Sequence, residues 1–256
     1  CFCHQTGSGH PVSKNQFPIV LQSSYNISDN IRHFSFVRQD GAPFAFIPGQ
    51  FINFHFEFEG ETLQRSYSIA CPPNNKSQLD VVIAYVEGGR ASRFFFNLQA
   101  GDVVNVSGPF GRLVLKEEPV TRYVLIATGT GVAPYRSMLP ELRERFAQEP
   151  TLEVDLLLGV RHRNECLYEQ EFIEFAKAHP RFRFHACFSR DDAVVDAEYE
   201  YLGRLSQRLP ALNLHPEQDI IYVCGNPDMI DEVYAFATGL GFNQRTVRRE
   251  KYVFSK

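Results

Sequence analysis

The sequence contains no tryptophan, only two methionines and no strong excess of charge of either sign. Its 26 Lys and Arg residues against 30 Asp and Glu residues give a net charge of −4, which argues against a nucleic-acid-binding protein. No apolar run reaches about 18 residues, the length that a membrane-spanning helix requires, so we expect no membrane span. The six cysteines are too scattered for a disulfide framework, and we expect a protein of the reducing cytoplasm.

The rest of the composition is that of a globular protein. Hydrophobic residues make up 44% of the 256 positions and charged residues 22%, which suits one large domain or two ordinary ones. The 23 phenylalanines favour strand-rich packing in at least part of the chain. The sequence has no internal repeat and no low-complexity segment, and we expect a monomer.

The first part of the chain has the pattern of short antiparallel strands. Apolar runs at residues 34–36, 51–56 and 79–85 are short and often alternate with polar residues, as half-buried strands do. Turn residues such as Pro48-Gly49 separate them. This punctuation predicts an antiparallel β-barrel over residues 17–118, after an N-terminal tail of residues 1–16.

The pattern changes near residue 119, after a short polar segment closed by proline. Continuous apolar runs now alternate with helical stretches, which is typical of βαβ units and a parallel sheet. We therefore predict an α/β domain with a doubly wound parallel sheet over residues 119–256. The runs cover residues 123–127, 154–158, 182–188 and 220–224, and the helical stretches cover residues 135–146, 167–179 and 227–238.

A glycine-containing turn follows the first strand of this second part. Gly129, Thr130 and Gly131 lead from the strand into a helix that has Pro134 in its first turn. Glycines let a ligand approach the backbone, and free N–H groups at a helix start suit a pyrophosphate. The third glycine of the dinucleotide fingerprint is missing, so the turn alone fits a plain strand–helix connection equally well.

The ends of the next strands bear on the choice between NAD and NADP. NAD sites place an acid at the end of the second strand, but that strand ends in residues 158–161 without one. The third strand ends in Ser189 and Arg190, which suit a 2′-phosphate, and Arg204 could add a second positive charge. This favours NADP. The alternative is a solvated Arg190 that the neighbouring Asp191 and Asp192 neutralise.

Three further segments have the residue types of a cofactor site. Arg65 and Tyr67 share one face of a strand with an apolar run after it, and a ring beside a guanidinium suits a planar cofactor with a phosphate. Residues 88–92 form a glycine turn at a helix start, a second candidate anion cradle. Cys224 ends a parallel strand, where ligands gather. Each segment alone also fits an ordinary strand, turn or buried cysteine.

Taken together and in this order, the motifs resemble those of the ferredoxin–NADP(+) reductase family, a two-domain fold that binds FAD and NADP(H). The resemblance spans about residues 17–254. Its motifs are residues 65–68 (RSYS), 88–92 (GGRAS), 108–111 (GPFG), 129–134 (GTGVAP) and 224–229 (CGNPDM). We interpret the third of these motifs, Gly108 to Gly111, as a structural turn.

The resemblance implies roles for individual residues. Tyr67 stacks on the flavin ring, Ser68 lies near its N5 atom, and Cys224 faces the nicotinamide. The remaining cofactor contacts that it implies fall in both parts of the chain. On FAD they are Arg65, Ser66, Tyr85, Gly89 and Ser92, and on NADP they are Gly129, Thr130, Gly131, Ser189, Arg190 and Arg204.

The end of the chain matches the family with one departure. Glu250 and Tyr252 resemble its terminal Glu-x-Tyr, whose ring covers the flavin face that nicotinamide must reach, but four residues follow here. Either Tyr252 or Phe254 is therefore the covering ring. Ser68, Cys224, Glu250 and Tyr252 form the catalytic group that the resemblance implies.

The implied function is a hydride transfer from NADPH to FAD, followed by single-electron transfer to a ferredoxin or flavodoxin. Residues Arg245, Arg248, Arg249 and Lys251 concentrate positive charge that could steer an acidic carrier or form a plain solvated edge. Two alternatives keep the fold: the reductase component of an oxygenase system, and a flavin electron-transfer subunit of a larger complex. A zinc module at Cys1, Cys3, His4 and His10 is a third, and its crowded ligands argue against it. We predict no metal site.

Overall fold

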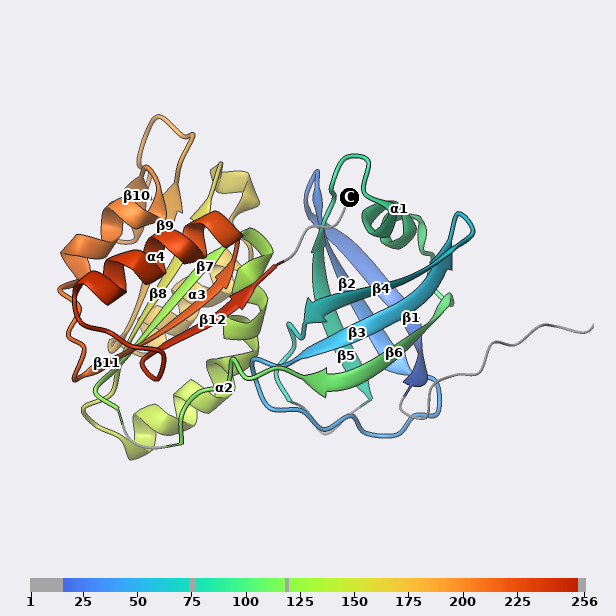
Figure 1. Ribbon diagram of the computed structural model, residues 1–256, viewed down its shortest axis with the longest axis horizontal. Coiled ribbons are helices and arrows are strands. Elements are labelled where there is room, and N and C mark those ends of the chain that lie inside the picture. Colours follow the sequence, from blue (N-terminus) through green and yellow to red (C-terminus); the bar gives the residue numbers. More distant parts are fainter. Residues whose placement is uncertain (1–15, 74–76, 118–119, 253–256) are drawn as a thin grey trace, which may run out of the picture.

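The computed structural model describes residues 16–73, 77–117 and 120–252, which form two halves side by side (Figure 1). The first half is an antiparallel sheet and the second a parallel sheet with helices on both faces. Both predicted architectures are therefore confirmed. None of the helices in these ranges is long and apolar enough to cross a membrane.

The first half is a curved six-stranded sheet whose strands follow the order β4-β3-β6-β1-β2-β5. It closes into a barrel where the Ala70 N–H, just past β4, donates to the Asp80 carbonyl of β5 at 2.8 Å. Phenylalanines fill the interior, with the rings of Phe54 and Phe95 edge to face at 5.0 Å. The elements are β1 (Gln16–Ser28), β2 (Ile31–Arg38), β3 (Phe51–Phe58), β4 (Glu61–Ser68), β5 (Gln78–Ala84), α1 (Arg90–Asn97) and β6 (Val103–Phe110).

The second half is a six-stranded parallel sheet in the order β10-β9-β8-β7-β11-β12. The strand order reverses between β7 and β11, which is where parallel sheets of this kind bind ligands. Its strands are β7 (Arg122–Thr128), β8 (Glu153–Val160), β9 (Phe182–Phe188), β10 (Glu200–Leu202), β11 (Asp219–Gly225) and β12 (Val247–Lys251). Its helices are α2 (Ala133–Gln148), α3 (Glu169–Ala178) and α4 (Pro227–Gly239), with short 3₁₀ segments η1 (Gly129–Val132), η2 (Arg163–Glu165) and η3 (Leu205–Leu212).

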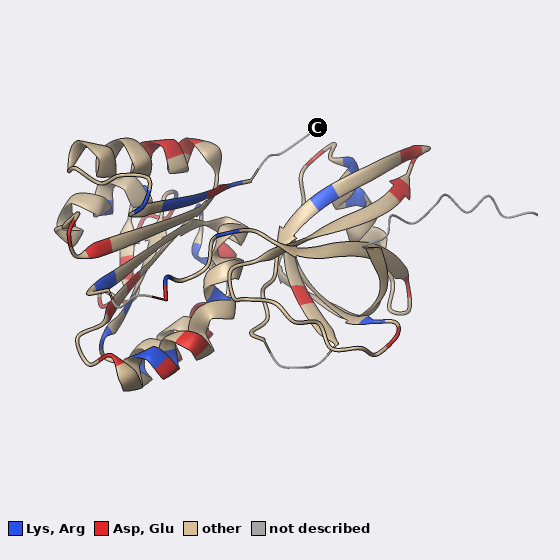
Figure 2. Ribbon diagram, turned by 60° about the horizontal axis from the view of Figure 1, so that its bottom comes forward, with Lys and Arg blue, Asp and Glu red and all other residues tan. Residues whose placement is uncertain are grey.

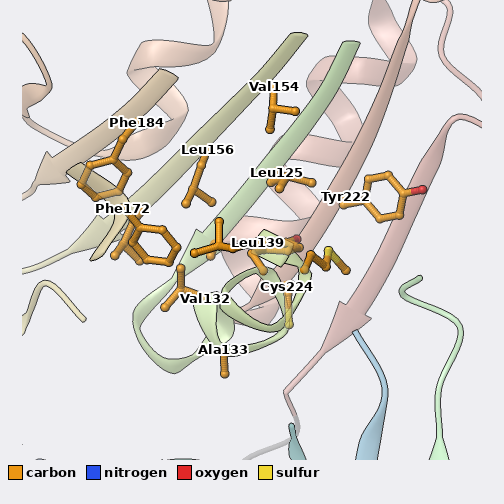
Figure 3. Packing of buried hydrophobic residues seen from close by; sticks show 14 of the residues in the cluster. Leu125, Val132, Ala133, Leu139, Val154, Leu156, Phe172, Phe184, Tyr222 and Cys224 are labelled. Atoms are coloured by element: carbon orange, nitrogen blue, oxygen red, sulfur yellow. The ribbon is translucent and has the colours of Figure 1, made fainter. Parts of the chain in front are cut away.

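Helices cover both faces of the parallel sheet. Side chains of α2 and α3, such as Leu139 and Phe172, pack on one face against Leu125 and Leu156 (Figure 3). Residues of η3 and α4 pack on the other face, with Leu205 and Ile230 fully or nearly fully buried. The strands of this sheet are apolar on both sides because both sides are covered.

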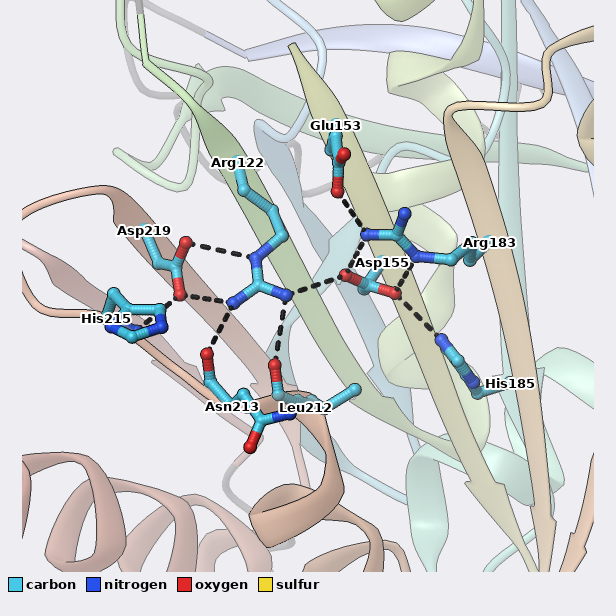
Figure 4. A network of polar contacts seen from close by, with 9 residues as sticks. All are labelled: Arg122, Glu153, Asp155, Arg183, His185, Leu212, Asn213, His215 and Asp219. Carbon is cyan, nitrogen blue, oxygen red and sulfur yellow. Dashed lines mark hydrogen bonds and ion pairs between the residues drawn. The ribbon is translucent and has the colours of Figure 1, made fainter. Parts of the chain in front are cut away.

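A charged network ties the amino ends of these strands together (Figure 4). Asp155, only 2% exposed, accepts hydrogen bonds from Arg183 at 2.8 Å and from His185 at 2.9 Å. Arg122 bridges Asp155 to Asp219 at the neighbouring strand. These buried charges are paired, as burial requires, and they lie at the edge of the sheet opposite the switch point.

One local expectation is wrong in detail, and another holds. Gly108, Pro109 and Phe110 are the end of strand β6, with a cis peptide bond before Pro109, rather than a turn. The strand expected at Arg65 to Ser68 is present as the end of β4, and the apolar residues follow it. The segment is still extended, so the expected alternation of its side chains is retained.

Candidate functional site

Two cavities meet between the halves of the molecule. The sheet cavity, about 430 Å³, lies beyond the carboxyl ends of β7, β8 and β11, and the barrel cavity, about 400 Å³, lies between β4, α1 and β12. Ala84 from β5 and Thr130 from η1 line both of them. The two cavities therefore adjoin at these two residues, which we call the junction.

Strand β4 supplies one wall of the barrel cavity. Arg65, Ser66, Tyr67 and Ser68 all line it. The Tyr67 ring packs edge to face on Phe95 at 5.2 Å, which fixes the ring plane, and burial raises the pKa of its hydroxyl. A fixed aromatic ring with a guanidinium beside it suits a planar cofactor that carries phosphate.

The start of α1 supplies the opposite wall. Gly89 is the N-cap residue of this helix and has no side chain to cap it, and Gly89, Ala91 and Ser92 line the cavity. The Ser92 hydroxyl lies 2.8 Å from the Val86 carbonyl and 3.0 Å from that of Gly89, so it holds the turn. The backbone N–H groups of the first helical turn are the donors that this wall offers to an anion.

A hydrogen-bonded cluster lines the barrel cavity next to the junction, where the Tyr252 hydroxyl lies 3.4 Å from the Thr130 carbonyl. The Ser68 hydroxyl lies 3.0 Å from the Tyr252 hydroxyl and 3.2 Å from Oε1 of Glu250. Tyr252 is held by its own N–H, which donates to the Gly225 carbonyl at 3.0 Å. Burial raises the pKa of the Glu250 carboxyl to about 7, and the Ser68 hydrogen bond offsets part of this shift. Strand β12 thus brings a carboxyl and a phenol to Ser68.

Cys224 lies beneath this cluster and not on a cavity wall. Its side chain is fully buried, and it lines neither cavity. Gly131 covers it on one side, where an added Cβ would come within 2.4 Å of the Cys224 carbonyl oxygen. Burial raises the pKa of the Cys224 thiol well above its usual range. The glycine at position 131 is therefore required by close packing.

The glycine turn after β7 lines the sheet cavity. Gly129 and Thr130 line the cavity, and Gly129 has a φ of +51° with open space where a side chain would stand. No side chain caps η1 or α2, whereas Asn226 caps α4 through bonds to Asp228 N and Met229 N. The free N–H groups at the end of β7 are therefore available to a phosphate.

The predicted 2′-phosphate residues are divided between two places. Ser189 and Arg204 line the sheet cavity, whereas Arg190 lines an adjoining open cavity of about 810 Å³ that shares Asn30 and Glu165 with it. Asp191 accepts from His162 at 2.8 Å and from the Arg163 N–H at 2.9 Å. Its carboxylate is therefore engaged away from Arg190.

Sequence reasoning missed an ion pair in the sheet cavity. The Arg161 guanidinium donates to both carboxylate oxygens of Glu165, at 2.6 Å and 3.2 Å. The acid expected at the end of the second strand in an NAD site thus stands four residues later, brought back by η2 and held by an arginine. An i, i+4 acid–base pair after the strand is the signal that could have identified it.

The remaining candidate positions are Tyr85 and five residues that the structure does not describe. Tyr85 packs its ring edge on Phe96 at 5.2 Å and lines neither cavity. Phe254 and the proposed zinc ligands Cys1, Cys3, His4 and His10 lie outside the described residues. Within residues 16–73, 77–117 and 120–252, no three His, Cys, Asp or Glu side chains are grouped to hold a metal ion.

Comparison with known proteins matches both halves. The family model "Oxidoreductase FAD-binding domain" matches residues 18–115, and "Oxidoreductase NAD-binding domain" matches residues 125–234. The ferredoxin–NADP reductase of Azotobacter vinelandii is 30% identical over 223 residues, which cover 81% of this chain and 84% of that protein. Ferredoxin–NADP reductase B of Sorangium cellulosum is 29% identical over 246 residues, which cover 94% and 99%.

Reductases of oxygenase systems are also similar. Terephthalate 1,2-dioxygenase reductase component 2 of Comamonas is 30% identical over 234 residues, which cover 90% of this chain but 66% of that protein. Among solved structures, the Amycolatopsis cytochrome P450 reductase GcoB has a TM-score of 0.79 at 28% identity, covering 93% of this chain and 69% of its own. A ferredoxin NADP+ reductase from Neisseria gonorrhoeae shares the fold, with a TM-score of 0.79 at 21% identity and coverage of 94% and 100%.

Proposed function

The chain belongs to the ferredoxin–NADP reductase family, and on that premise we propose that it passes electrons from NADPH through FAD to a ferredoxin or flavodoxin. Membership makes it an oxidoreductase that uses a flavin to transfer electrons from NAD(P)H. FAD accepts a hydride as an electron pair and releases the electrons singly, which couples a two-electron donor to one-electron carriers.

The observation that carries the proposal is the meeting of the two cavities at Ala84 and Thr130. Hydride transfer requires reacting atoms about 3–3.5 Å apart with aligned faces. A flavin ring against Tyr67 and a nicotinamide that enters from the turn at Gly129 would face each other at this junction. The open turn after β7 and the uncapped start of α1 fit the two pyrophosphates.

We assign the FAD contacts to β4 and α1. Tyr67 supports the ring, and Arg65 and Ser66 contact the phosphates. The N–H groups of the first turn of α1, up to Ser92, bind the pyrophosphate, whereas the Gly89 N–H already donates to the Val86 carbonyl at 2.9 Å, so Gly89 lets the cofactor approach the backbone. Cavity lining, the fixed Tyr67 ring and the absence of a side-chain cap on α1 support these roles. Tyr85 lines neither cavity, so we leave it out of the proposed contacts.

Tyr252 is our candidate for the residue that gates the nicotinamide. It lines the barrel cavity at the junction, where its hydroxyl bonds to Ser68, and it covers Cys224. Its ring must move aside before the nicotinamide reaches the flavin. That movement would uncover Cys224 next to the nicotinamide and leave Ser68 and Glu250 to hold a proton near the reacting atoms.

We propose NADP as the favoured nucleotide. Ser189 and Arg204 line the sheet cavity and Arg190 lies next to it, so all three can reach a 2′-phosphate near the ends of β8 and β9. The Arg161–Glu165 pair neutralises the acid that would otherwise bind the ribose of NAD. A phosphate would compete with Glu165 for Arg161.

For the acceptor, we propose a small acidic electron carrier that docks on a basic groove. This groove, about 610 Å³, shares the lining residue Glu250 with the barrel cavity. Figure 2 shows strand β12 largely in blue, and in its sequence Arg248 and Arg249 precede Glu250 and Lys251 follows it. The Lys251 ammonium is paired with Asp231 at 2.6 Å and adds less free charge than expected. The basic residues that line the groove are Arg112, Lys116, Arg245, Arg248 and Arg249.

The second candidate is the reductase component of an oxygenase system, because relatives with that name are as similar as the ferredoxin reductases. The chain spans 60–66% of the length of these oxygenase relatives, so part of each relative has no counterpart in the match. A flavin subunit without its own nucleotide site is disfavoured by the sheet cavity with Ser189 and Arg204.

Anaerobic titration of the purified protein with NADPH, and separately with NADH, tests the chemistry. We expect a yellow protein that releases FAD on denaturation. Its flavin absorbance band at roughly 450 nm should be bleached by one equivalent of NADPH. A protein that holds FAD but keeps its colour under NADPH would favour the subunit alternative, and a protein that cannot be loaded with FAD would overturn the proposal.

A second experiment identifies the acceptor. Steady-state reduction of a ferredoxin, a flavodoxin and an oxygenase component should be fastest with the physiological class, and the rate should fall as salt screens the groove. Arg248→Gln should lower the rate at which acidic carriers are reduced and make that rate less dependent on salt. Arg183→Gln, at the opposite edge of the sheet, should leave the salt dependence unchanged. Equal salt dependence in all proteins would exclude the groove as the docking site.

A further inference from the structure

One arginine joins the two halves of the molecule next to the cavity junction. Arg136 lies in the first turn of α2, and its Nη1 group donates to the Ala70 carbonyl of the barrel at 3.0 Å. Ala70 is fully buried and stands two residues after Ser68. The bond therefore links α2, which follows the glycine turn, to the segment that follows β4, the strand that lines the barrel cavity.

Both ends of this link are held firmly. On the helix side, Nε of Arg136 donates to Glu171 at 2.7 Å, and the guanidinium stacks on the Tyr168 ring at 4.5 Å. On the barrel side, the Ala70 N–H donates to the Asp80 carbonyl at 2.8 Å, so both backbone groups of Ala70 are bonded. A planar guanidinium can stack and donate in two directions at once, which an ammonium cannot do.

Neighbouring contacts extend the same connection. The Tyr168 hydroxyl lies 2.9 Å from Nδ1 of His33, a buried barrel residue that faces Asp80. Ser137, next to Arg136, accepts a hydrogen bond from the Gly49 N–H at 3.1 Å. The first turns of α2, which lie beside the barrel in Figure 1, thus contact two barrel segments, at Ala70 and Gly49, and Tyr168 at the start of α3 contacts a third at His33.

We propose that Arg136 is a positioning residue for hydride transfer, which sets the separation of the two cofactor rings by holding α2 against the barrel. Thr130 and Ser68 line the same cavity from opposite halves, and Arg136 and Ala70 follow them within six and two residues. The inference rests on the proposed function. It assigns to Arg136 no contact with either cofactor, since Arg136 lines neither cavity.

The test replaces Arg136 by Met, which keeps the apolar stem and removes all donors, and by Lys, which keeps the charge. Arg145→Met is the matched control, because Arg145 is a similarly buried arginine of the same helix that pairs with Glu141 and Tyr123 away from the barrel. Each FAD-loaded protein is mixed with saturating NADPH in an anaerobic stopped-flow instrument. The limiting rate of flavin bleaching, the dissociation constant for NADP+ and the FAD content are measured.

A displacement of about 1 Å between the reacting groups can slow a reaction about 100-fold. We therefore expect the limiting rate of flavin bleaching in Arg136→Met to be roughly 10- to 100-fold lower than in the wild type. The dissociation constant and FAD content should stay near those of the wild type, Arg136→Lys should be intermediate, and Arg145→Met should keep the wild-type rate. If Arg136→Met does not fold, the rate of Arg136→Lys decides in the same way.

Three results would overturn the inference: a wild-type limiting rate in the Arg136 variants, an equal loss in Arg145→Met, or a loss of rate that merely follows a loss of FAD or nucleotide binding. The wild-type protein in the same experiment reports on the proposed function separately. If NADPH does not bleach its flavin, the proposed function fails before the variants are compared.

Discussion

At the scale of single residues, Glu250 combines a half-buried position with a place in the barrel cavity near the junction. Burial raises the pKa of its carboxyl to about 7, above the usual value near 4.5. The folded protein therefore holds this proton more tightly than the unfolded chain does. Its contribution to stability is complete below the unfolded pKa and is lost as the pH rises through 7.

This titration should appear in the chemistry as well. We expect the limiting rate of flavin bleaching to change with an apparent pKa close to 7, because ionisation of Glu250 alters the hydrogen bond from Ser68. Glu250→Gln should abolish that step in the pH profile while the protein still binds FAD. Stopped-flow rates measured from roughly pH 5.5 to roughly pH 8.5 bracket this pKa. If the step in the pH profile persists in Glu250→Gln, another group is responsible for it.

Nucleotide preference is a second residue-scale property. We expect Arg204→Ala and Arg190→Ala each to raise the apparent constant for NADPH about tenfold, which corresponds to about 1.4 kcal/mol for one lost charge-assisted contact. The constant for NADH should change little, because NADH lacks the 2′-phosphate. Steady-state kinetics with both nucleotides measure this, and equal effects on the two would remove the case for a phosphate site at these arginines.

The resemblance to a known family predicted part of this site. Ser68, Glu250 and Tyr252 were expected near one another, and the structure brings them within hydrogen-bonding distance although 182 and 184 positions separate them. The Arg161–Glu165 pair was missed because a search confined to the strand end does not include the turn that follows it. The complete burial of Cys224 could not be predicted from the sequence either, since it depends on how Gly131 and Tyr252 pack over it.

At the scale of elements, the strongly apolar strands and the amphipathic helices were predictable and the polar edges were not. Strand β9 has the predicted bounds because all its neighbours bury it. Strand β12 reads Val-Arg-Arg-Glu-Lys, without apolar alternation, and forms only because β11 offers it a free edge. Tertiary pairing, not local propensity, determines such a strand.

The connection between β2 and β3 contains a glycine that the packing demands. Gly49 has a φ of +97°, and an added Cβ would stand 2.0 Å from the Leu113 carbonyl oxygen and 2.7 Å from Cε of Met138. We expect Gly49→Ala to lower the free energy of unfolding by about 3 kcal/mol, from backbone strain and overpacking together. Gly41→Ala is the control, because Gly41 has a φ of +68° with no atom within 4 Å of the added Cβ.

Gly41→Ala should cost only about 1 kcal/mol, the strain of a left-handed alanine. Urea unfolding of both variants gives the comparison. Similar losses in the two variants would show that backbone conformation, and not the close approach of Leu113, accounts for the glycine at position 49.

At the scale of the whole molecule, the two halves share one hydrophobic core. Ile31, Val82 and Leu113 of the barrel side belong to the same buried cluster as Leu125 and Leu139 of the sheet side. A second cluster fills the barrel and a third lies under α4. The halves are therefore joined by apolar packing as well as by Arg136, which is more than a flexible linker would provide.

This shared core predicts that the halves unfold together. Leu113 is 3% exposed, and Leu113→Ala removes apolar contacts at the boundary between barrel and sheet, at a cost of about 3 kcal/mol. If the boundary is part of one cooperative unit, thermal unfolding followed by flavin fluorescence and by far-ultraviolet circular dichroism should give coincident transitions in the wild type, and both should shift together in Leu113→Ala. Leu209→Ala, in the cluster under η3 and α4, is a control of similar burial that leaves the boundary intact. Separate transitions in the wild-type protein would mean that each half is stable alone, and the relative placement of the two cavities would then depend on far fewer contacts than the shared core provides.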